Sequence, residues 1–249
     1  MAYLGRSVLV GNTVRANNAP SALELYGSNA TLIHNTLIAN TASNSALVLC
    51  NSDAALYETM VISNTAGSGL FLRGSSAALT NTVVTNNRPS TSGGYGLYIT
   101  DGSFPRLVHT TIAHNGGSEG TGVYVPAFSE GEAVAVTMTN TILLGHKWGI
   151  YVSSMSDAAT LDGTLWGNTF DSYGLGTTIT GTHNYWGDPR FAADGYHLLS
   201  GSAAIDRGVN AGVTNDIDGD TRTGIPDLGA DEAATSDWHY IYLPVVVRQ

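Results

Sequence analysis

One short phrase recurs along most of this 249-residue chain. A polar pair is followed by two apolar residues, one variable residue and usually Asn, as in Asn35-Thr36-Leu37-Ile38-Ala39-Asn40. The copies end at positions 17, 40, 64, 86, 115, 145 and 168, which are separated by steps of 23, 24, 22, 29, 30 and 23 residues. A fixed period of this length indicates a repeat architecture in which each unit packs on its neighbours.

A second phrase keeps a constant phase with the first. It is a small residue followed by an apolar, a variable and an apolar residue, and its copies begin at positions 22, 46, 69, 96, 122 and 149. Both phrases alternate like short half-buried strands. A unit of about 23 residues is too short for a strand–helix–strand crossover of about 30 residues. We therefore predict an all-β solenoid of about eight coils, with parallel strands stacked ~4.8 Å apart.

The turns of each coil have their own predicted residues. Asn at the end of the first phrase tolerates a left-handed backbone better than most residues. Gly at the start of the second phrase suits another left-handed corner. We expect residues 1–200 to form the solenoid, residues 201–232 an Asp-rich C-terminal cap, and residues 233–249 an apolar tail.

The chain begins without a basic region followed by an apolar run, so no signal peptide is recognised. The repeat is already visible by residue 12, and we expect the chain to start inside its fold. No stretch approaches the ~18 apolar residues that span a bilayer.

The repeat resembles the right-handed parallel β-helix of the pectin-lyase-like superfamily, over about residues 7–200. The run Asn184-Tyr185-Trp186-Gly187-Asp188-Pro189 is similar to late coils of bacterial secreted β-helices. The segments 196–208, 216–222 and 227–232 resemble the end of surface β-helix proteins of the choice-of-anchor type. This resemblance implies a bacterial protein that is secreted or held at the cell surface.

Charge is sparse and mostly acidic. Asp, Glu, Lys and Arg make up 12% of the residues, about half of the ~25% usual in soluble domains. The 20 acidic and 10 basic residues give a net charge of −10, and Lys147 is the single lysine. An acidic chain without a basic run disfavours nucleic acid as a partner. The single cysteine, Cys50, excludes an internal disulfide.

The middle position of the second phrase carries aromatic residues on successive coils: Phe71, Tyr98, Tyr124 and Tyr151. One interpretation is a flat platform for sugar rings. The other is ordinary cross-strand packing beneath a loop or the C-terminal segment. Insertions at 88–94, 116–120 and 126–132 lie near this column, and long loops on adjacent coils often border a binding face.

A polysaccharide lyase or glycoside hydrolase remains an alternative, and it would use the groove beside the tyrosine column. Such an enzyme needs paired carboxylates, or basic groups close to them. The coils offer few candidates, and these match no catalytic motif of either class, so no catalytic residue is predicted: Asp101, Arg106, Glu119, Glu130, Glu132, His146 and Lys147.

Alternate carboxylates near the C-terminus are the ligands that Ca²⁺ prefers. Asp216, Asp218, Asp220 and Asp227 are therefore candidate ligands of a structural calcium, although their spacing fits an EF-hand poorly. The alternative is a polar terminal coil in which Arg222 pairs with a carboxylate. No cofactor is required by either interpretation.

Taken together, these residues favour a non-catalytic extracellular protein that binds a polysaccharide or cell-surface glycan, adheres or assembles. The apolar strand at 238–248 could add to an exposed edge, so a filament stacked through open coil ends is a further alternative.

Overall fold

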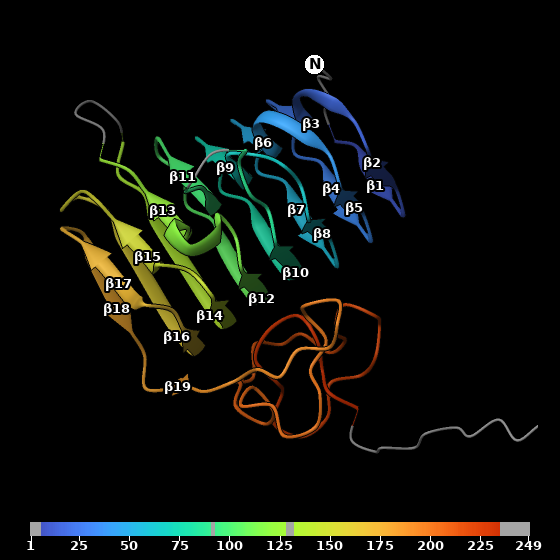
Figure 1. The fold of residues 1–249 in the computed structure, drawn as a ribbon, viewed down its shortest axis with the longest axis vertical. Helices are drawn as coiled ribbons and strands as arrows, with labels where there is room; N and C mark the ends of the chain where they lie inside the picture. Colours follow the sequence, from blue (N-terminus) through green and yellow to red (C-terminus); the bar gives the residue numbers. More distant parts are fainter. Residues whose placement is uncertain (1–5, 91–92, 128–131, 235–249) are drawn as a thin grey trace, which may run out of the picture.

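The computed structural model describes residues 6–90, 93–127 and 132–234. The strands in this part of the chain wind into a solenoid of two parallel sheets (Figure 1). Sheet A has seven strands, one from each of seven successive coils: β3 (Asn18–Tyr26), β6 (Thr41–Cys50), β9 (Ser68–Arg73), β11 (Tyr95–Thr100), β13 (Thr121–Val125), β15 (Trp148–Val152) and β17 (Phe170–Gly174).

Sheet B has twelve strands, because the first three coils and the last coil contribute two short strands each and the four coils between them one long strand each. They are β1 (Val8–Val10), β2 (Thr13–Arg15), β4 (Thr31–Ile33), β5 (Thr36–Ile38), β7 (Ala55–Tyr57), β8 (Met60–Ile62), β10 (Ala78–Thr85), β12 (Arg106–Ala113), β14 (Ala135–Leu144), β16 (Ala158–Gly167), β18 (Thr177–Thr180) and β19 (Asn184–Trp186). The described residues contain no α-helix and one short 3-10 helix, η1 (Gly117–Glu119).

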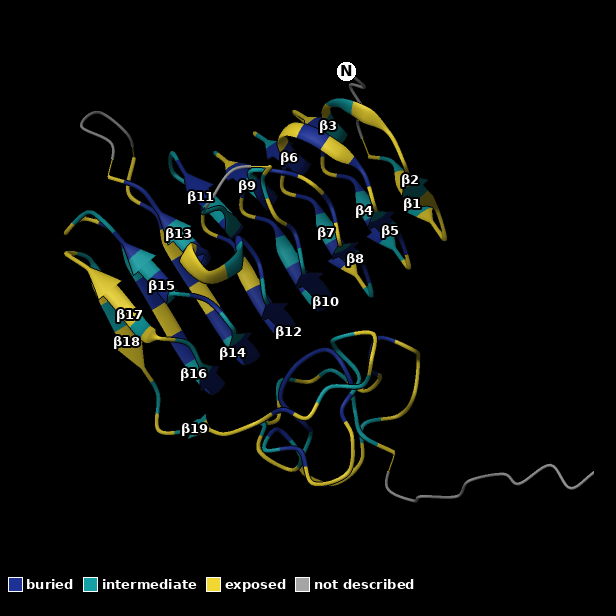
Figure 2. Cartoon of the chain, viewed as in Figure 1, coloured by how far each residue is buried: buried dark blue, intermediate teal, exposed yellow. Residues whose placement is uncertain are grey.

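The core runs along the inside of the solenoid as columns of aliphatic side chains. In sheet A, residues in register on successive coils are fully buried, as are Leu49, Leu72 and Ile99. These columns merge into one hydrophobic cluster that spans the coils. Figure 2 shows the buried residues along the strands of both sheets. No coil could bury its apolar face alone, so burial requires the stack. The predicted all-β parallel solenoid of about eight coils is confirmed.

A ladder of buried amides follows the turn between sheet B and sheet A. Asn64 Oδ1 accepts hydrogen bonds from both the backbone N and Nδ2 of Asn40, each at 2.9 Å. Asn64 Nδ2 donates in turn to Asn87 Oδ1 at 2.8 Å. The ladder runs through these positions in chain order: Asn17, Asn40, Asn64, Asn87, Asn115, His146 and Asn168.

Two positions of the predicted Asn column were therefore wrong by one residue, since Asn87 and His146 belong to the ladder rather than residues 86 and 145. The left-handed backbone also lies elsewhere than expected. It belongs to the residue before every ladder position except Asn168, as at Ala39, Ser63 and Asn86. The ladder residue itself turns inward, where its amide pairs with the neighbouring coils.

The glycines that open the second phrase do not take positive φ, so the expected left-handed corner is wrong there. They are required by close approach instead. A Cβ on Gly96 would lie 2.6 Å from the Gly122 carbonyl oxygen and 2.7 Å from Cγ2 of the buried Ile112. Because these glycines point into the core, the residue before each of them faces outward.

After β19 the chain leaves the solenoid as an irregular C-terminal segment, residues 187–234. It lies along the outer face of sheet B (Figure 1), where Leu198, Ala204 and Leu228 pack on Ile142 and Leu165. The predicted boundary at residue 200 falls inside this segment. Residues 201–232 thus cover the side of the coils, whereas the predicted tail at 233–249 lies outside the described residues from residue 235 onward.

Polar contacts fix the C-terminal segment in place. Asn140 bonds both backbone groups of Val209, and Asn81 Nδ2 donates to the Asn215 carbonyl at 2.7 Å. Arg222 is buried and donates to Glu232 at 3.1 Å and to Asn81 Oδ1 at 3.2 Å. The predicted pairing of Arg222 with a carboxylate is therefore observed.

Candidate functional site

The outer face of sheet A carries a row of rings, one from each of five successive strands. The strands pair in register so that Phe71, Tyr98, Tyr124, Tyr151 and Tyr173 follow one another across β9, β11, β13, β15 and β17. We call this column, which continues through Val48 and Glu24 on β6 and β3, the Tyr98 row. The structure thus brings together all four predicted platform residues and adds Tyr173.

A second column runs beside it, which we call the Tyr95 row. Its members, in register from β3 to β17, are Ser21, Ser45, Ser68, Tyr95, Thr121, Trp148 and Phe170. The two rows lie on one face because the glycine between them turns inward, so that residues three apart both point outward. Tyr95 and Tyr98 show this directly, with ring centroids 5.2 Å apart.

The rings of both rows contact one another across the strands. Tyr95 stacks on Tyr124 with centroids 4.7 Å apart, and Tyr124 meets Tyr98 and Tyr151 edge to face at 5.4 and 5.3 Å. Trp148 extends the contacts to Tyr151 and Tyr173. We call these rings the aromatic face: Phe71, Tyr95, Tyr98, Tyr124, Trp148, Tyr151, Phe170 and Tyr173.

The aromatic face is open to solvent in the described part of the chain. Phe71, Tyr98, Tyr124 and Tyr151 are each partly exposed, and the exposure of Tyr173 rises to 56% at the end of the sheet. The C-terminal segment does not lie over them, since it packs on sheet B. Among the described residues, the rings pack on one another across the strands and are not covered by the C-terminal segment.

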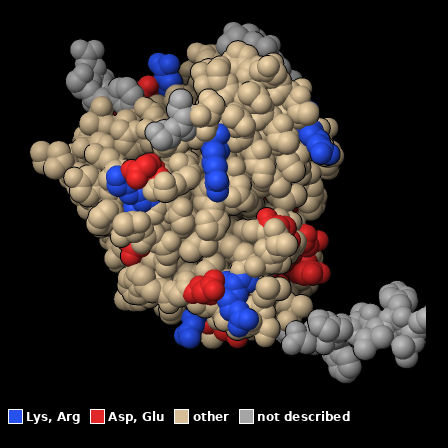
Figure 3. All heavy atoms as spheres, in the orientation of Figure 1, with Lys and Arg blue, Asp and Glu red and all other residues tan. Residues whose placement is uncertain are grey.

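Charges near the aromatic face are balanced. Lys147 Nζ lies 4.5 Å from the centroid of Trp148 and 2.6 Å from Glu119 Oε2. Arg73 pairs with Asp101 at 2.9 Å. Charged side chains are scattered thinly over the coils and gather over the C-terminal segment (Figure 3). The cations beside the face are thus already paired with carboxylates.

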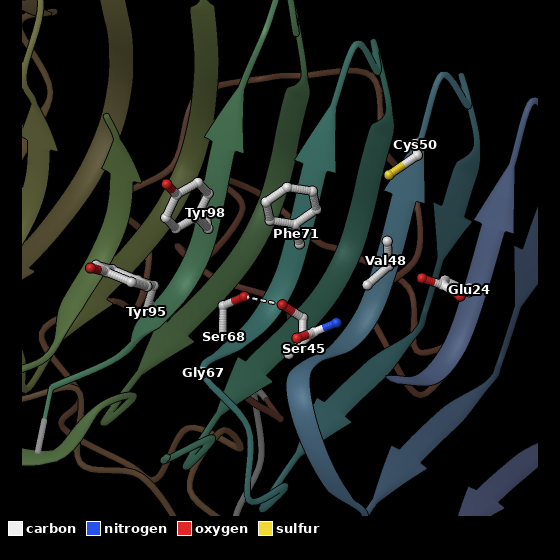
Figure 4. Close-up of a pocket in the computed structure, with 10 residues that line it drawn as sticks. Glu24, Ser45, Val48, Cys50, Gly67, Ser68, Phe71, Tyr95 and Tyr98 are labelled. Atoms are coloured by element: carbon white, nitrogen blue, oxygen red, sulfur yellow. Dashed lines mark hydrogen bonds between the residues drawn. The ribbon is translucent and has the colours of Figure 1, made fainter. Parts of the chain in front are cut away.

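A groove of about 350 Å³ lies where the rings of the Tyr95 row end. Ser45 and Ser68 take the place of rings there, and their hydroxyl oxygens are 2.6 Å apart (Figure 4). Phe71, Tyr95 and Tyr98 border the groove on one side, and Val48, Cys50 and Glu24 line the other. We call it the serine groove.

Burial favours the neutral form of three ionisable groups around the serine groove, Cys50, Tyr95 and Tyr98. Burial raises the pKa of the Cys50 thiol, and the nearby Glu24 adds to this while Arg73 opposes it. Burial and the neighbouring Tyr124 raise the pKa of Tyr95 and Tyr98. The tyrosine hydroxyls therefore stay protonated at neutral pH and remain hydrogen-bond donors.

Sequence reasoning missed Tyr95 and Trp148. Strict alternation places the residue before the glycine inside the solenoid, so neither ring joins the predicted column. A usable signal was the aromatic residue immediately before Gly96 and Gly149. Of the predicted insertions, residues 88–90 lie between β10 and β11 in the chain and residues 116–120 between β12 and β13, while part of 126–132 lies outside the described residues. Glu119 of the second insertion reaches Lys147 beside Trp148.

Two of the candidate acid and base groups, Lys147 and Glu119, are bound to each other, and the other described candidates are held by structural partners or are exposed. Asp101 and Lys147 are in the ion pairs described above, and His146 belongs to the Asn ladder. Burial lowers the pKa of His146 to about 4, so its imidazole is neutral. Arg106, on β12 of the other sheet, and Glu132 are exposed, and Glu130 lies outside the described residues. The charged groups beside the aromatic face are thus held in ion pairs, Lys147 with Glu119 and Arg73 with Asp101.

Two of the four predicted calcium ligands, Asp216 and Asp227, bind backbone amides. Asp216 Oδ1 accepts from the amides of Asp218 and Asp220, and its Oδ2 accepts from Glu232. Asp227 accepts from the amides of Asp206 and Ala233, and burial raises its pKa to about 6. Asp216 and Asp227 thus close loops of the C-terminal segment, and binding of calcium by the four predicted residues stays a prediction.

Among the described residues, the metal-ligating side chains that do converge are His197, Asp218 and Asp231, whose ligand atoms lie within 4.8 Å of one another. Only Asp218 is shared with the predicted set. His197 sits between two carboxylates, with Nδ1 2.6 Å from Asp194 and Nε2 2.6 Å from Asp218. Burial would lower the pKa of His197, but these hydrogen bonds outweigh it and raise the pKa to about 9.

Parallel sheets wound coil upon coil around an Asn ladder, with rings on one outer face, define a parallel β-solenoid with an exposed aromatic face. The sequence matches the family described as right handed beta helix region over residues 2–172, and the chain belongs to this family. No curated protein matches the sequence. The family match ends before residues 184–232, on which the resemblance to choice-of-anchor proteins depends.

No helix among the described residues has the length and apolar character needed to cross a bilayer.

Proposed function

We propose that this protein binds a neutral polysaccharide along the aromatic face of sheet A and does not cleave it. The observation that carries the proposal is the row of partly exposed rings from Phe71 to Tyr173, repeated on adjacent strands. Parallel strands are ~4.8 Å apart, which is close to the length of one sugar unit in an extended chain. A polymer running along the solenoid axis would therefore meet one ring per coil.

Aromatic rings suit this task because a pyranose presents an apolar face of C–H groups and a polar rim of hydroxyls. The negatively charged face of a ring attracts such weakly positive C–H groups. The tyrosine hydroxyls at the ring edges can hydrogen-bond the rim. Ligand sites commonly combine such apolar walls with a few polar groups.

Neutral glycans fit the charges better than uronates do. A polyuronate requires unpaired cations, whereas Lys147 and Arg73 beside the face are each bound to a carboxylate. Cleavage would further require a pair of acid–base groups on the face. Lys147 and Glu119 meet beside Trp148, but each is bound to the other, which supports binding without hydrolysis or elimination.

The experiment is a depletion assay with insoluble cellulose, chitin and starch, using the wild-type protein, Tyr124→Ala and Tyr57→Ala. Tyr124 contacts three rings at the centre of the face, whereas Tyr57 is an exposed ring on the opposite sheet. We expect one polymer to retain the wild type and Tyr57→Ala, and to bind Tyr124→Ala roughly tenfold more weakly, about 1.4 kcal/mol. Equal binding of all three proteins would contradict the proposal.

The last coil supports a second candidate function, end-to-end assembly. Phe170, Leu175, Ile179 and Trp186 are exposed at this end to between 53% and 71%. Its strands β17 and β18 also present an unpaired edge that could continue into the first coil of another copy. Light scattering of Ile179→Lys beside the wild type tests this: a monomeric wild type at high concentration contradicts assembly.

We further propose that the protein acts outside the cell or at its surface, as the resemblance of residues 184–232 implies. Fractionation of the source cells with an antibody against the protein tests this location.

A further inference from the structure

The aromatic face ends differently in its two rows. In the Tyr98 row the last ring is Phe71 on β9, whereas in the Tyr95 row the last ring is Tyr95 on β11. The next two positions of the Tyr95 row are Ser68 and Ser45, so one ring-sized space remains beside Phe71. This space is the serine groove (Figure 4).

The floor of the groove is polar and built into the sheet. Ser45 and Ser68 are 4% and 3% exposed, and the hydrogen bond between their hydroxyls uses one proton. Each hydroxyl oxygen carries two acceptor lone pairs and one proton, so the pair retains capacity for a ligand hydroxyl. Phe71, stacked on Tyr98 at 5.3 Å, forms an apolar wall above this floor.

Beyond Phe71 the Tyr98 row offers no further ring. Val48 comes next, and Glu24 follows on β3. A carboxylate accepts two hydrogen bonds from neighbouring hydroxyls. A glycan that lies along the Tyr98 row would therefore pass the last ring, Phe71, and reach the carboxylate of Glu24. This carboxylate can accept hydrogen bonds from two adjacent free hydroxyls of a terminal sugar. Glu24 is also the one carboxylate lining the groove, so its charge disfavours an anionic sugar.

We propose that the serine groove holds the terminal sugar of a neutral glycan whose chain lies along the aromatic face. This inference rests on the proposed function and adds recognition of a chain end. The groove volume of about 350 Å³ is in the range of small-ligand pockets. In this arrangement the rings contact the internal sugars of the glycan, and Ser45, Ser68 and Glu24 hydrogen-bond its terminal sugar.

The test compares short soluble chains with long polymers. The soluble probes are cellopentaose, chitopentaose and maltopentaose, measured by titration calorimetry, and the polymers are insoluble cellulose, chitin and starch. Ser68→Tyr extends the Tyr95 row and fills the groove with a ring, in a strand whose neighbour already carries Tyr95. Glu24→Gln removes the charge with little change of shape. Ser76→Tyr, which adds a ring at an exposed position away from the face, is the control.

We expect Ser68→Tyr to bind the pentaose at least tenfold more weakly, Glu24→Gln to bind it several-fold more weakly, and both to bind the polymer within about twofold of the wild type. Ser76→Tyr should match the wild type with both probes. Unchanged pentaose binding by Ser68→Tyr, together with polymer binding that is lost in Tyr124→Ala, would overturn this inference alone. A wild type that binds neither pentaose nor polymer would overturn the proposed function and this inference with it.

Discussion

Tyr95 and Tyr124 lie face to face across neighbouring strands, with ring planes 11° apart, although they belong to different rows of sheet A. This stacking is possible because Gly96 turns inward and places Tyr95 on the outer face. The arrangement of the aromatic face thus depends on Gly96, which points into the core and is not itself part of the face. Its rings are held by one another and by the strand spacing, which gives the face a fixed shape before any ligand arrives.

Gly96→Ala tests that dependence. The added Cβ would lie 2.6 Å from the Gly122 carbonyl oxygen, so the strand must shift or the variant must lose packing. We expect a loss of about 1–3 kcal/mol in the free energy of unfolding, measured by urea denaturation. Ser76→Ala, at an exposed position, should unfold as the wild type does. A Gly96→Ala variant of wild-type stability would show that the close approach is not required.

The Asn ladder predicts that substitutions at two adjacent asparagines change the free energy of unfolding by very different amounts. Asn87 is fully buried and accepts from Asn64, and Asn87→Ala would leave buried donors without a partner. We expect it to lower the unfolding free energy by about 2–4 kcal/mol. Asn86→Gly should change it by less than about 1 kcal/mol, because φ at residue 86 is 56° and suits glycine. A reversed order of the two variants in denaturant would contradict the ladder register.

Arg222 is expected to control the attachment of the C-terminal segment. Its side chain is 2% exposed and pairs with Glu232, which is 7% exposed. Removing one partner of such a buried pair typically costs about 3–5 kcal/mol. We expect Arg222→Met to make residues 187–234 sensitive to protease and to increase binding of a hydrophobic dye to sheet B. Wild-type protease resistance in this variant would refute the assignment.

The His197 contacts predict loss of stability at alkaline pH. The folded pKa of about 9 lies above the ordinary value of 6.5, so the stabilisation is complete below pH 6.5 and is lost as the pH rises through 9. Asp194, Asp218 and Asp231 face the imidazolium, and Tyr196, with its pKa raised to about 12, does not titrate in this window. The melting temperature of the wild type should fall between pH 7 and 10 more than that of His197→Gln. Parallel curves for the two proteins would rule out this role.

Calcium is expected to have little effect on the fold. Asp216 and Asp227 already accept backbone hydrogen bonds with both of their oxygens. The melting temperature should therefore differ by less than about 1 °C between excess calcium and EGTA, because a ligand stabilises only what it binds. A rise of several degrees with calcium would restore the predicted site.

The period of the repeat was sufficient to predict the coils, the parallel pairing and the register of Tyr98, Tyr124 and Tyr151, because stacked coils require equal phase. The predicted ladder position was wrong by one residue where two adjacent residues fit the pattern, as at Asn86 and Asn87, and where His146 takes the place of Asn. Tyr95 escaped prediction because an inward glycine breaks the alternation of the strand. The packing of the C-terminal segment on sheet B could not be predicted from the repeat, because this segment does not share its period. Asn81 and Asn215, for example, are hydrogen-bonded although they lie 134 residues apart in the sequence.

The central claim is that the aromatic face is the surface that contacts a glycan, and hydroxyl-radical footprinting on the bound polymer tests it most directly. Oxidation of Tyr98, Tyr124 and Tyr151 should fall when the protein is bound to the polysaccharide that retains it, while oxidation of Tyr57 on sheet B should stay unchanged. Protection of Tyr57, or equal oxidation of the face in the free and bound states, would contradict the account.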